Sequence, residues 1–332
     1  MPAHVRRKFA GVDEAGLGPM LGPLTLGFSV FEAPVDAREL WSALAPVVTG
    51  DPSKDRERFV VADSKLVFKR TPRCAKRLEA TALGFLALLD PARRPHTRVG
   101  RLLWETPSDL AASADVVARH PWYRDLAAVL PVHQDASVLE LRVESLWRAM
   151  QRCEVKLLDA GLRVLPEGEL NRSFAETSNK AATHWSASLA IFQRVWRQHA
   201  HGGIELCIDR HGGRMHYGSM LARSFTDASV LLVSETPERS EYDLAERRGP
   251  RKMRVVFAER AEQSSFAVAL ASCLAKYARE TAMDSFNAWF AARAPDLTPT
   301  AGYTTDARRW LVDAAAVIAR EQLDRSHLVR DR

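Results

Sequence analysis

The stretch from Phe9 to Pro23 limits most strongly what this chain can fold into. It reads FAGVDEAGLGPMLGP: an apolar run ends on two adjacent acids, Asp13 and Glu14, and a turn rich in glycine and proline follows. Strand interiors disfavour charged side chains, so a strand that ends on two acids beside a glycine loop indicates a site that a ligand approaches closely. The alternative is a strand end followed by a solvated turn, where Asp, Glu and Gly are all common.

Length and composition are those of an ordinary globular protein. The chain has 332 residues, of which 46% are hydrophobic and 27% charged, enough for a full core in one large domain or two. No apolar run approaches the ~20 residues that span a bilayer, so no membrane partner is expected. The N-terminus lacks the pattern of an export signal, and the cysteines form no CxxC pair, which predicts a cytoplasmic protein. A formal charge of +6 tolerates a polyanionic partner without indicating one.

Other apolar runs predict the remaining architecture. Strands are expected at 24–31, 161–165, 204–209, 229–234 and 253–258, and helices at 73–89, 179–200, 215–225, from 264 onward with Ser264 as its N-cap, and at about 305–322. An early strand hairpin followed by strand–helix units predicts an α/β fold, with a mixed sheet covered by helices on both faces. Prolines and tryptophans between about 90 and 152 predict a mostly helical insertion, with helices at 108–119 and 137–150, in a single domain spanning 1–332.

Acids recur beside two further elements. Asp209 ends the apolar run IELCID, and Glu262 directly precedes the long helix. If the strands ending at Asp13 and Asp209 are neighbours, the acids meet at one edge of the sheet, where unpaired negative charge is destabilising and two Mg²⁺ or Mn²⁺ ions would offset it. Many nucleases use two such ions ~4 Å apart to activate a water and to stabilise the leaving oxygen. Adjacent strand residues point to opposite faces, so Asp13 and Glu14 share a site only if the chain bends, and Ala15–Gly16 is the expected bend.

Other candidate ligands have weaker support in the sequence. His201, His211 and His216 lie in one region without an acid pattern of their own, and His184 is interpreted as structural. Lys65 either contacts a phosphate or lies in a solvated loop. No Walker loop or GxGxxG is present, so nothing indicates a nucleotide cofactor.

Four stretches resemble the signature motifs of the type 2 ribonucleases H, the family of prokaryotic ribonuclease HII and ribonuclease HIII. They are GVDEAGLGP at 11–19, ADSK at 62–65, ASCLAK at 271–276 and GYTT at 302–305, in the order that the family has. The resemblance covers roughly 9–70 and 157–312. It implies a ribonuclease H-like fold and a metal-dependent endoribonuclease that hydrolyses the RNA strand of RNA–DNA hybrids with two Mg²⁺ or Mn²⁺ ions, leaving 5′-phosphate and 3′-hydroxyl ends.

The resemblance also implies roles for individual residues. The catalytic and metal-binding residues would be Asp13, Glu14, Asp209 and Glu262. The substrate-binding residues would be Gly16, Leu17, Gly18 and Tyr303, with Lys65 as a candidate phosphate contact. The glycine loop would lie against ribose 2′-hydroxyls, and the tyrosine would stack on the sugar beside the scissile phosphate. Glu262 is similar to the HIII branch, where HII has aspartate, and Leu17 stands where HII has arginine.

Two other interpretations stay open at this stage. One is a non-catalytic nucleic-acid-binding protein on the same fold, although a binder gains nothing from acids that face phosphates. The other is a nuclease of this fold with a different substrate, which Leu17 and the insertion both motivate. In each case we expect a nucleic-acid partner and a monomer.

Overall fold

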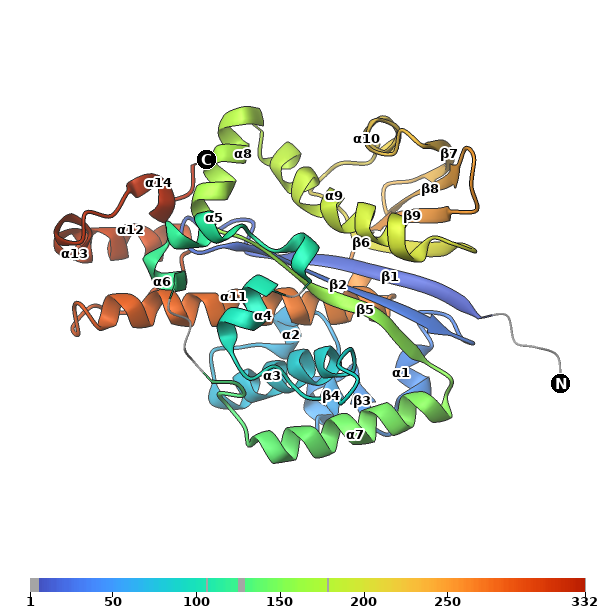
Figure 1. Cartoon of the computed structure of the whole chain (residues 1–332), viewed down its shortest axis with the longest axis horizontal. Coiled ribbons are helices and arrows are strands. Elements are labelled where there is room, and N and C mark those ends of the chain that lie inside the picture. The colour runs from blue at the N-terminus through green and yellow to red at the C-terminus, as the bar shows by residue number, and fades with distance from the viewer. Residues whose placement is uncertain (1–5, 106, 125–128, 178, 332) are drawn as a thin grey trace.

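The computed structural model of this chain describes residues 6–105, 107–124, 129–177 and 179–331, and a seven-stranded sheet lies at its centre (Figure 1). The strands follow the order β5-β2-β1-β6-β9-β8-β7. Their bounds are β1 (Arg7–Ala15), β2 (Leu24–Ala33), β5 (Lys156–Leu165), β6 (Ile204–Asp209), β7 (Ala228–Glu235), β8 (Arg239–Glu246) and β9 (Lys252–Ala258). β1, β6 and β9 run parallel and the other pairs are antiparallel. The predicted mixed sheet is confirmed.

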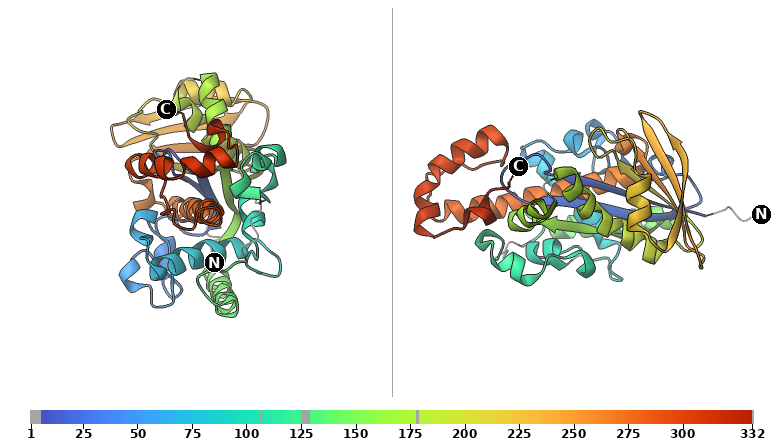
Figure 2. Two further views of the ribbon diagram at one scale, coloured as in Figure 1. Left: turned by 90° about the vertical axis from the view of Figure 1, so that its left-hand side faces the viewer. Right: turned by 90° about the horizontal axis from the view of Figure 1, so that it is seen from above.

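Helices cover both faces of this sheet, as the end-on view in Figure 2 shows. On one face lie α11 (Phe266–Ala291) and α3 (Pro72–Ala87), and on the other lies α9 (Lys180–His199). Side chains of β1 alternate between these two cores: Phe9 packs with α11, whereas Ala10 and Val12 pack with α9. By the same alternation, odd-numbered residues of β1 point toward α11 and even-numbered residues point toward α9.

Two glycines let α11 lie directly on the central strands. A Cβ at Gly11 would lie 2.1 Å from the backbone nitrogen of Val268, and one at Gly27 would lie 2.2 Å from the carbonyl oxygen of Ala271. The hydroxyl of Ser29 adds a hydrogen bond of 2.9 Å to the carbonyl of Ala267. These contacts fix where α11 lies along β1 and β2. They therefore also fix where its side chains lie relative to the ends of these strands.

The remaining elements are short or peripheral. They are α1 (Leu40–Ala43), β3 (Val48–Thr49), η1 (Pro52–Lys54), β4 (Phe59–Val60), α2 (Ser64–Val67), α8 (Glu167–Thr177), α10 (Gly218–Ser224), η3 (Ala261–Gln263), α12 (Thr304–Asp313), α13 (Ala315–Arg320) and α14 (Arg325–Leu328). The segment predicted as an insertion contains α4 (Val99–Glu105), η2 (Ser108–Leu110), α5 (Ala114–Ala118), α6 (Pro121–Arg124) and α7 (Ala136–Arg152). Buried side chains of α7 join the same core as α3. The division into one domain with an insertion stays a prediction.

Several predicted boundaries were wrong. The N-cap of α11 is Ser265, whose hydroxyl accepts a hydrogen bond from the backbone of Val268, and not Ser264. The C-terminal helix expected at about 305–322 is two helices, α12 and α13, which meet at Ala314. The helix expected at 108–119 is divided between η2 and α5. Among the described residues we find no helix with the length and apolarity that a membrane crossing requires.

Candidate active site

Two neighbouring parallel strands carry acids to the same edge of the sheet. β6 ends on Asp209, and β1 carries Asp13 near its end. Their register pairs Val12 with Ile208, so the next residue on each strand, Asp13 and Asp209, stands at the same level. The condition on which the acid cluster depended, that these two strands are neighbours, is met.

The two adjacent acids of β1 leave opposite faces of the sheet. β1 stays paired with β2 through Ala15, so the expected bend at Ala15–Gly16 does not lie between them. The Asp13 carboxyl is on the side of α11, where Ser272 opposes the rise of its pKa, whereas Glu14 Oε2 lies 3.4 Å from His184 Nε2 on α9. The expectation that the chain bends to bring both acids to one face was wrong, because an unbroken ladder preserves the two-residue alternation.

Asp13 and Asp209 carry negative charge that nothing nearby neutralises fully. Burial and the charge of Glu14 raise the pKa of Asp13 well above its ordinary value, and the charge of Asp209 adds to this, while hydrogen bonds to the carboxylate act in the other direction. Burial and Glu14 also raise the pKa of Asp209, although the backbone N–H of Ala261 donates to Asp209 Oδ1 at 3.2 Å. Such raised pKa values mark a place where a bound cation would be stabilising.

Glu262 lies in η3, which connects β9 to α11 beside Asp209. Burial raises the pKa of Glu262, the charges of Asp209 and Asp63 add to the shift, and Lys65 opposes it. Lys65 itself is exposed, and its backbone N–H donates to Asp63 Oδ1 at 2.9 Å at the start of α2. The structure therefore brings Lys65 and the unforeseen Asp63 toward Glu262.

The ADSK and ASCLAK motifs meet through a pair of serines. The Ser272 hydroxyl lies 3.0 Å from the Ser64 hydroxyl, and the backbone N–H of Ser64 points at Ser272 Oγ over 3.3 Å. Ser272 thus connects α2 to α11 beside Asp13, and it opposes the rise of the Asp13 pKa. Sequence reasoning did not single out Ser272, although both motifs that contain these serines had been recognised.

Glu14 faces a pair of stacked histidines. The ring centroids of His184 and His211 lie 3.9 Å apart at an interplanar angle of 31°. Burial alone would raise the pKa of Glu14, but His184 and then His211 lower it overall. Burial and the neighbouring His184 in turn lower the pKa of His211 to about 3, so this ring is neutral at neutral pH. The role of His184 beside Glu14 had no signal in the sequence, because α9 is far from β1 along the chain.

The other two candidate histidines lie elsewhere. His216 Nδ1 lies 2.6 Å from Glu235 on the surface, and His201 is exposed at a bridge with Arg251. Within the described ranges, no group of three or more His, Cys, Asp or Glu side chains is placed to hold a metal ion. The oxygen donors of the acid cluster are nevertheless of the type that Mg²⁺ and Mn²⁺ prefer, and their raised pKa values fit such a cation.

The glycine loop and the tyrosine loop are joined by backbone hydrogen bonds. The N–H groups of Met20 and Leu21 donate to the carbonyl of Gly302 at 2.7 and 3.2 Å. Gly302 has a φ of +79°, and a Cβ there would lie 2.4 Å from the Leu21 carbonyl oxygen, so this contact requires glycine. Leu17 and Tyr303 are 39% and 54% exposed, so both side chains are accessible to a ligand.

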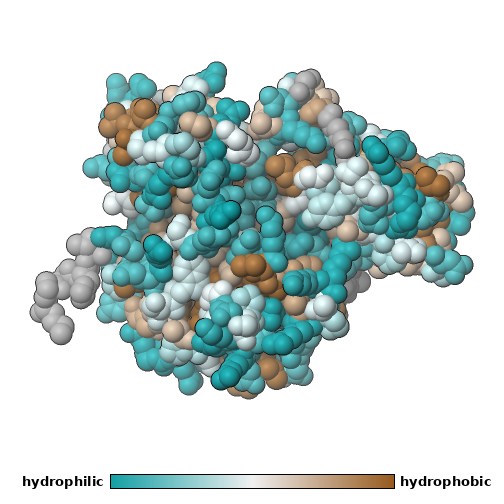
Figure 3. All heavy atoms as spheres, turned by 180° about the vertical axis from the view of Figure 1, so that it is seen from behind, coloured by the Kyte–Doolittle hydropathy of each residue, from teal (hydrophilic) through white to brown (hydrophobic). Residues whose placement is uncertain are grey.

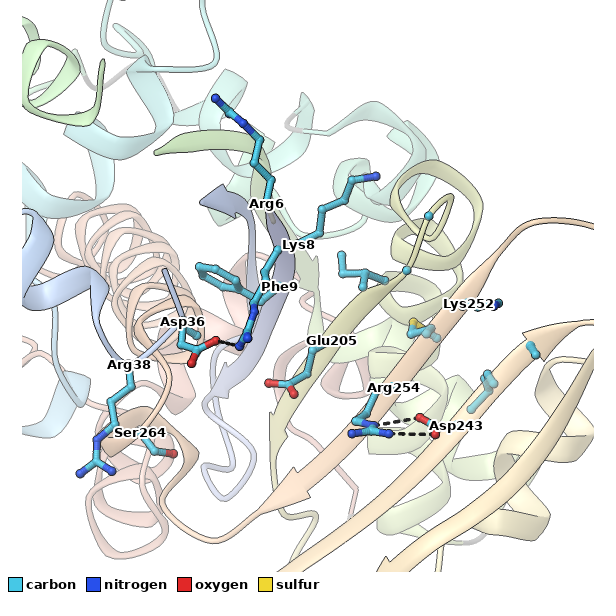
Figure 4. A pocket seen from close by; sticks show the side chains of 18 residues that line it. Arg6, Lys8, Phe9, Asp36, Arg38, Glu205, Asp243, Lys252, Arg254 and Ser264 are labelled. Atoms are coloured by element: carbon cyan, nitrogen blue, oxygen red, sulfur yellow. Dashed lines mark hydrogen bonds and ion pairs between the residues drawn. The ribbon is translucent and has the colours of Figure 1, made fainter. Parts of the chain in front are cut away.

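A separate basin of about 860 Å³ lies at the other end of the sheet, where β1, β6 and β9 begin (Figure 4). Arg6, Lys8 and Lys252 line it, and Arg254 is paired there with Asp243 at 2.9 Å. None of the predicted site residues lines this basin.

No protein-family model matches the chain, and a search of curated proteins found no match. Solved structures with a similar fold are ribonuclease HII from Archaeoglobus fulgidus in its complex with PCNA (13% identity, 98% of this chain and 94% of that chain, TM-score 0.40) and ribonuclease H2 from Pyrococcus horikoshii OT3 (13%, 97% and 92%, 0.38). Bst-RNase HIII in complex with Mn²⁺ is another (14%, 98% and 66%, 0.38). These solved structures bear names of the family that the sequence motifs resemble. At such identities and TM-scores the superpositions add nothing about activity.

Proposed function

We propose that this chain is a metal-dependent endoribonuclease of the type 2 ribonuclease H kind, which hydrolyses the RNA strand of RNA–DNA hybrids. One observation supports it above the others: Asp13 and Asp209 stand level on neighbouring parallel strands, and Glu262 lies beside Asp209. The exposed glycine loop and Tyr303 provide a surface for sugar and phosphate close to the end of β1.

Each group of residues has a distinct task in this proposal. Asp13, Asp209 and Glu262, with Glu14 from the other face, would hold two Mg²⁺ or Mn²⁺ ions, and bound ions of this kind supply an activated water and stabilise the leaving oxygen. The hydrogen bond from the Ala261 backbone orients Asp209, and Ser272, which opposes the rise of the Asp13 pKa, lies beside that second aspartate. The glycine loop and Tyr303 would orient the ribose and phosphate, with Lys65 as a cation for the phosphate backbone.

The test uses a matched RNA–DNA hybrid with a labelled RNA strand, incubated with Mg²⁺, with Mn²⁺ and with EDTA. We expect cleavage only with metal, and a loss on the order of a hundredfold or more in Asp13→Asn and in Asp209→Asn. Asp243→Asn, on an exposed ion pair of the sheet's far side, is the matched control and should cleave at the wild-type rate. Wild-type cleavage by both asparagine variants would show that the acids are misassigned.

One observation favours a second candidate, a hybrid-binding protein without nuclease activity. Glu14 leaves the face opposite to Asp13 and lies 3.4 Å from His184, so a histidine faces its carboxylate, although its charge still reaches Asp13 and Asp209. In that case the wild-type protein would bind the labelled hybrid and leave it intact under every metal condition.

A further inference from the structure

Two buried arginines lie beneath the glycine loop, and neither was expected from the sequence. Arg279 on α11 is 1% exposed, and Arg330, which follows α14, is 8% exposed. Arg279 Nη1 donates to the carbonyl of Pro23 at 2.8 Å. Arg330 Nε donates to the carbonyl of Gly22 at 2.7 Å, and its Nη1 donates to the carbonyl of Gly16. The loop between β1 and β2 therefore turns its carbonyl groups inward, toward guanidinium groups.

The N–H groups of the same loop divide into two sets. Those of Met20, Leu21 and Gly22 are occupied, the first two by Gly302 and the third by a carboxylate oxygen of Glu167 at 3.0 Å. Within the part of the chain that the structure describes, the N–H groups of Leu17 and Gly18 make no hydrogen bond. Both of these residues are exposed. Free backbone donors on a loop that has no charged side chain suit phosphate oxygens and ribose hydroxyls.

We propose that Arg330 is a positioning residue for the substrate: it holds the glycine loop so that the N–H groups of Leu17 and Gly18 face the sugar–phosphate backbone of the RNA strand. This inference rests on the proposed function and concerns its binding step.

Burying a second guanidinium beside Arg279 is energetically costly if its only role is to hold the loop in place. Burial and the like charge of Arg279 lower the pKa of Arg330 to about 9, because a second cation is unfavourable at this place. The nearby Glu167 is buried too, and burial raises its pKa to about 7, so it compensates the two cations incompletely. A neutral donor would close the loop at a smaller cost, whereas a guanidinium reaches the carbonyls of Gly16 and Gly22 at once.

The experiment compares Arg330→Gln and Arg330→Lys with Arg325→Gln, an exposed arginine of the same C-terminal segment. We measure Kd for a fluorescein-labelled RNA–DNA hybrid in EDTA, and kcat and KM in Mg²⁺. Arg330→Gln should raise Kd and KM about tenfold and leave kcat within about twofold, because the chemistry at the acids is unchanged. Arg330→Lys keeps the charge but loses the planar fork, so it should lie between wild type and Arg330→Gln. Arg325→Gln should change Kd and KM less than twofold.

A purely structural role gives a different pattern: a lower thermal midpoint and a lower kcat, through a smaller active fraction, with KM and Kd unchanged. That pattern would overturn the inference.

Hydrogen exchange on the wild-type protein provides a readout that needs no variant. The peptide containing Leu17 and Gly18 should exchange more slowly when the hybrid is bound, and an unchanged rate would refute the inference. A wild-type protein that does not bind the hybrid would refute the proposed function itself.

Discussion

Glu167 shows how strongly single residues beneath the glycine loop depend on their surroundings. Its Oε1 accepts hydrogen bonds from the backbone of Gly22 at 3.0 Å and from the hydroxyl of Tyr123 at 3.3 Å. Burial raises its pKa to about 7, well above the ~4.3 of an unfolded chain. Between these values the folded state holds one proton more than the unfolded state, so the stability falls as pH rises through this window.

We therefore predict that Glu167→Gln flattens the pH dependence of stability. The glutamine keeps the shape and an acceptor oxygen but cannot lose a proton, so the fall between about pH 4.5 and pH 7.5 should shrink. Urea unfolding midpoints at several pH values test this, with Glu176→Gln, an exposed glutamate on the same helix, as the control. An equally steep profile in Glu167→Gln would assign the pH dependence to other groups.

At the residue scale the sequence predicted which acids lie near one another but not how they face. Asp13, Asp209 and Glu262 follow from strand ends and motif spacing, which are local patterns. The pairing of Glu14 with His184 and of Arg330 with the glycine loop joins segments far apart in the chain. No local pattern encodes such contacts, because they depend on how α9 and the C-terminal segment pack in three dimensions.

The contact between α11 and β1 leads to a prediction at the scale of elements. A Cβ at Gly11 would lie 2.1 Å from backbone atoms of α11, which cannot move aside as a flexible side chain does. Gly11→Ala should therefore destabilise the protein by ~3 kcal/mol or more, since the helix must lift from the sheet. Gly213→Ala is the control, because a Cβ there meets nothing within 4 Å. A change below ~1 kcal/mol at Gly11 in chemical unfolding would contradict the close contact.

The edge strand β7 is the second element with a testable consequence. Leu231, Leu232 and Val233 are 66%, 54% and 44% exposed. Figure 3 shows an apolar patch at its upper left, the corner where the end of the sheet with β7 lies in that view. Edge strands usually carry charges that prevent pairing with other chains, and this stretch of β7 carries none.

Leu232→Lys should therefore reduce aggregation during refolding without changing activity, because a charge now opposes strand pairing at the open edge. Light scattering after dilution from urea measures the effect. Leu141→Lys makes the same change on the exposed side of α7, away from any sheet edge, and should have a smaller effect. Equal scattering by the two variants would assign the aggregation to general hydrophobicity.

Elements were predictable where the sequence pattern is strong. The strands β1, β2, β6, β7 and β9 follow from apolar runs, and α9 from the apolar stripe along it. Boundary predictions were wrong where two neighbouring residues could serve equally well. Ser264 and Ser265 are both N-cap residues by type, and only the structure shows that the hydroxyl of Ser265 caps α11. The division of the C-terminal helix at Ala314 had no signal, since alanine is the best helix former.

For the molecule as a whole, the surface around the glycine loop bears on substrate choice. Leu17 offers no cation and no side-chain donor, so under the proposed function only backbone groups of the loop would reach sugar and phosphate at this point. We predict that the protein prefers a run of ribonucleotides to one embedded ribonucleotide, because several 2′-hydroxyls along an A-like duplex compensate for the missing arginine.

The measurement is kcat/KM on a duplex with one ribonucleotide and on one with at least four. Tyr303 is exposed and available for stacking at a single site, so some cleavage of the first duplex is compatible with the prediction. Equal or faster cleavage of the single site would show that the loop backbone and Tyr303 suffice. The monomeric state stays a prediction.

The hydrogen bond from Arg330 to Gly16 joins residues 314 positions apart, which gives the site a place in the order of synthesis. A ribosome that has made the chain through η3 has made the loop and all four acids, but not the arginine that fixes the loop. Since domains begin to fold during synthesis, the sheet has time to form first. The loop of Gly16 becomes anchored only after residue 330 emerges, so a nascent chain carries its candidate catalytic acids before it can present an ordered surface to nucleic acid.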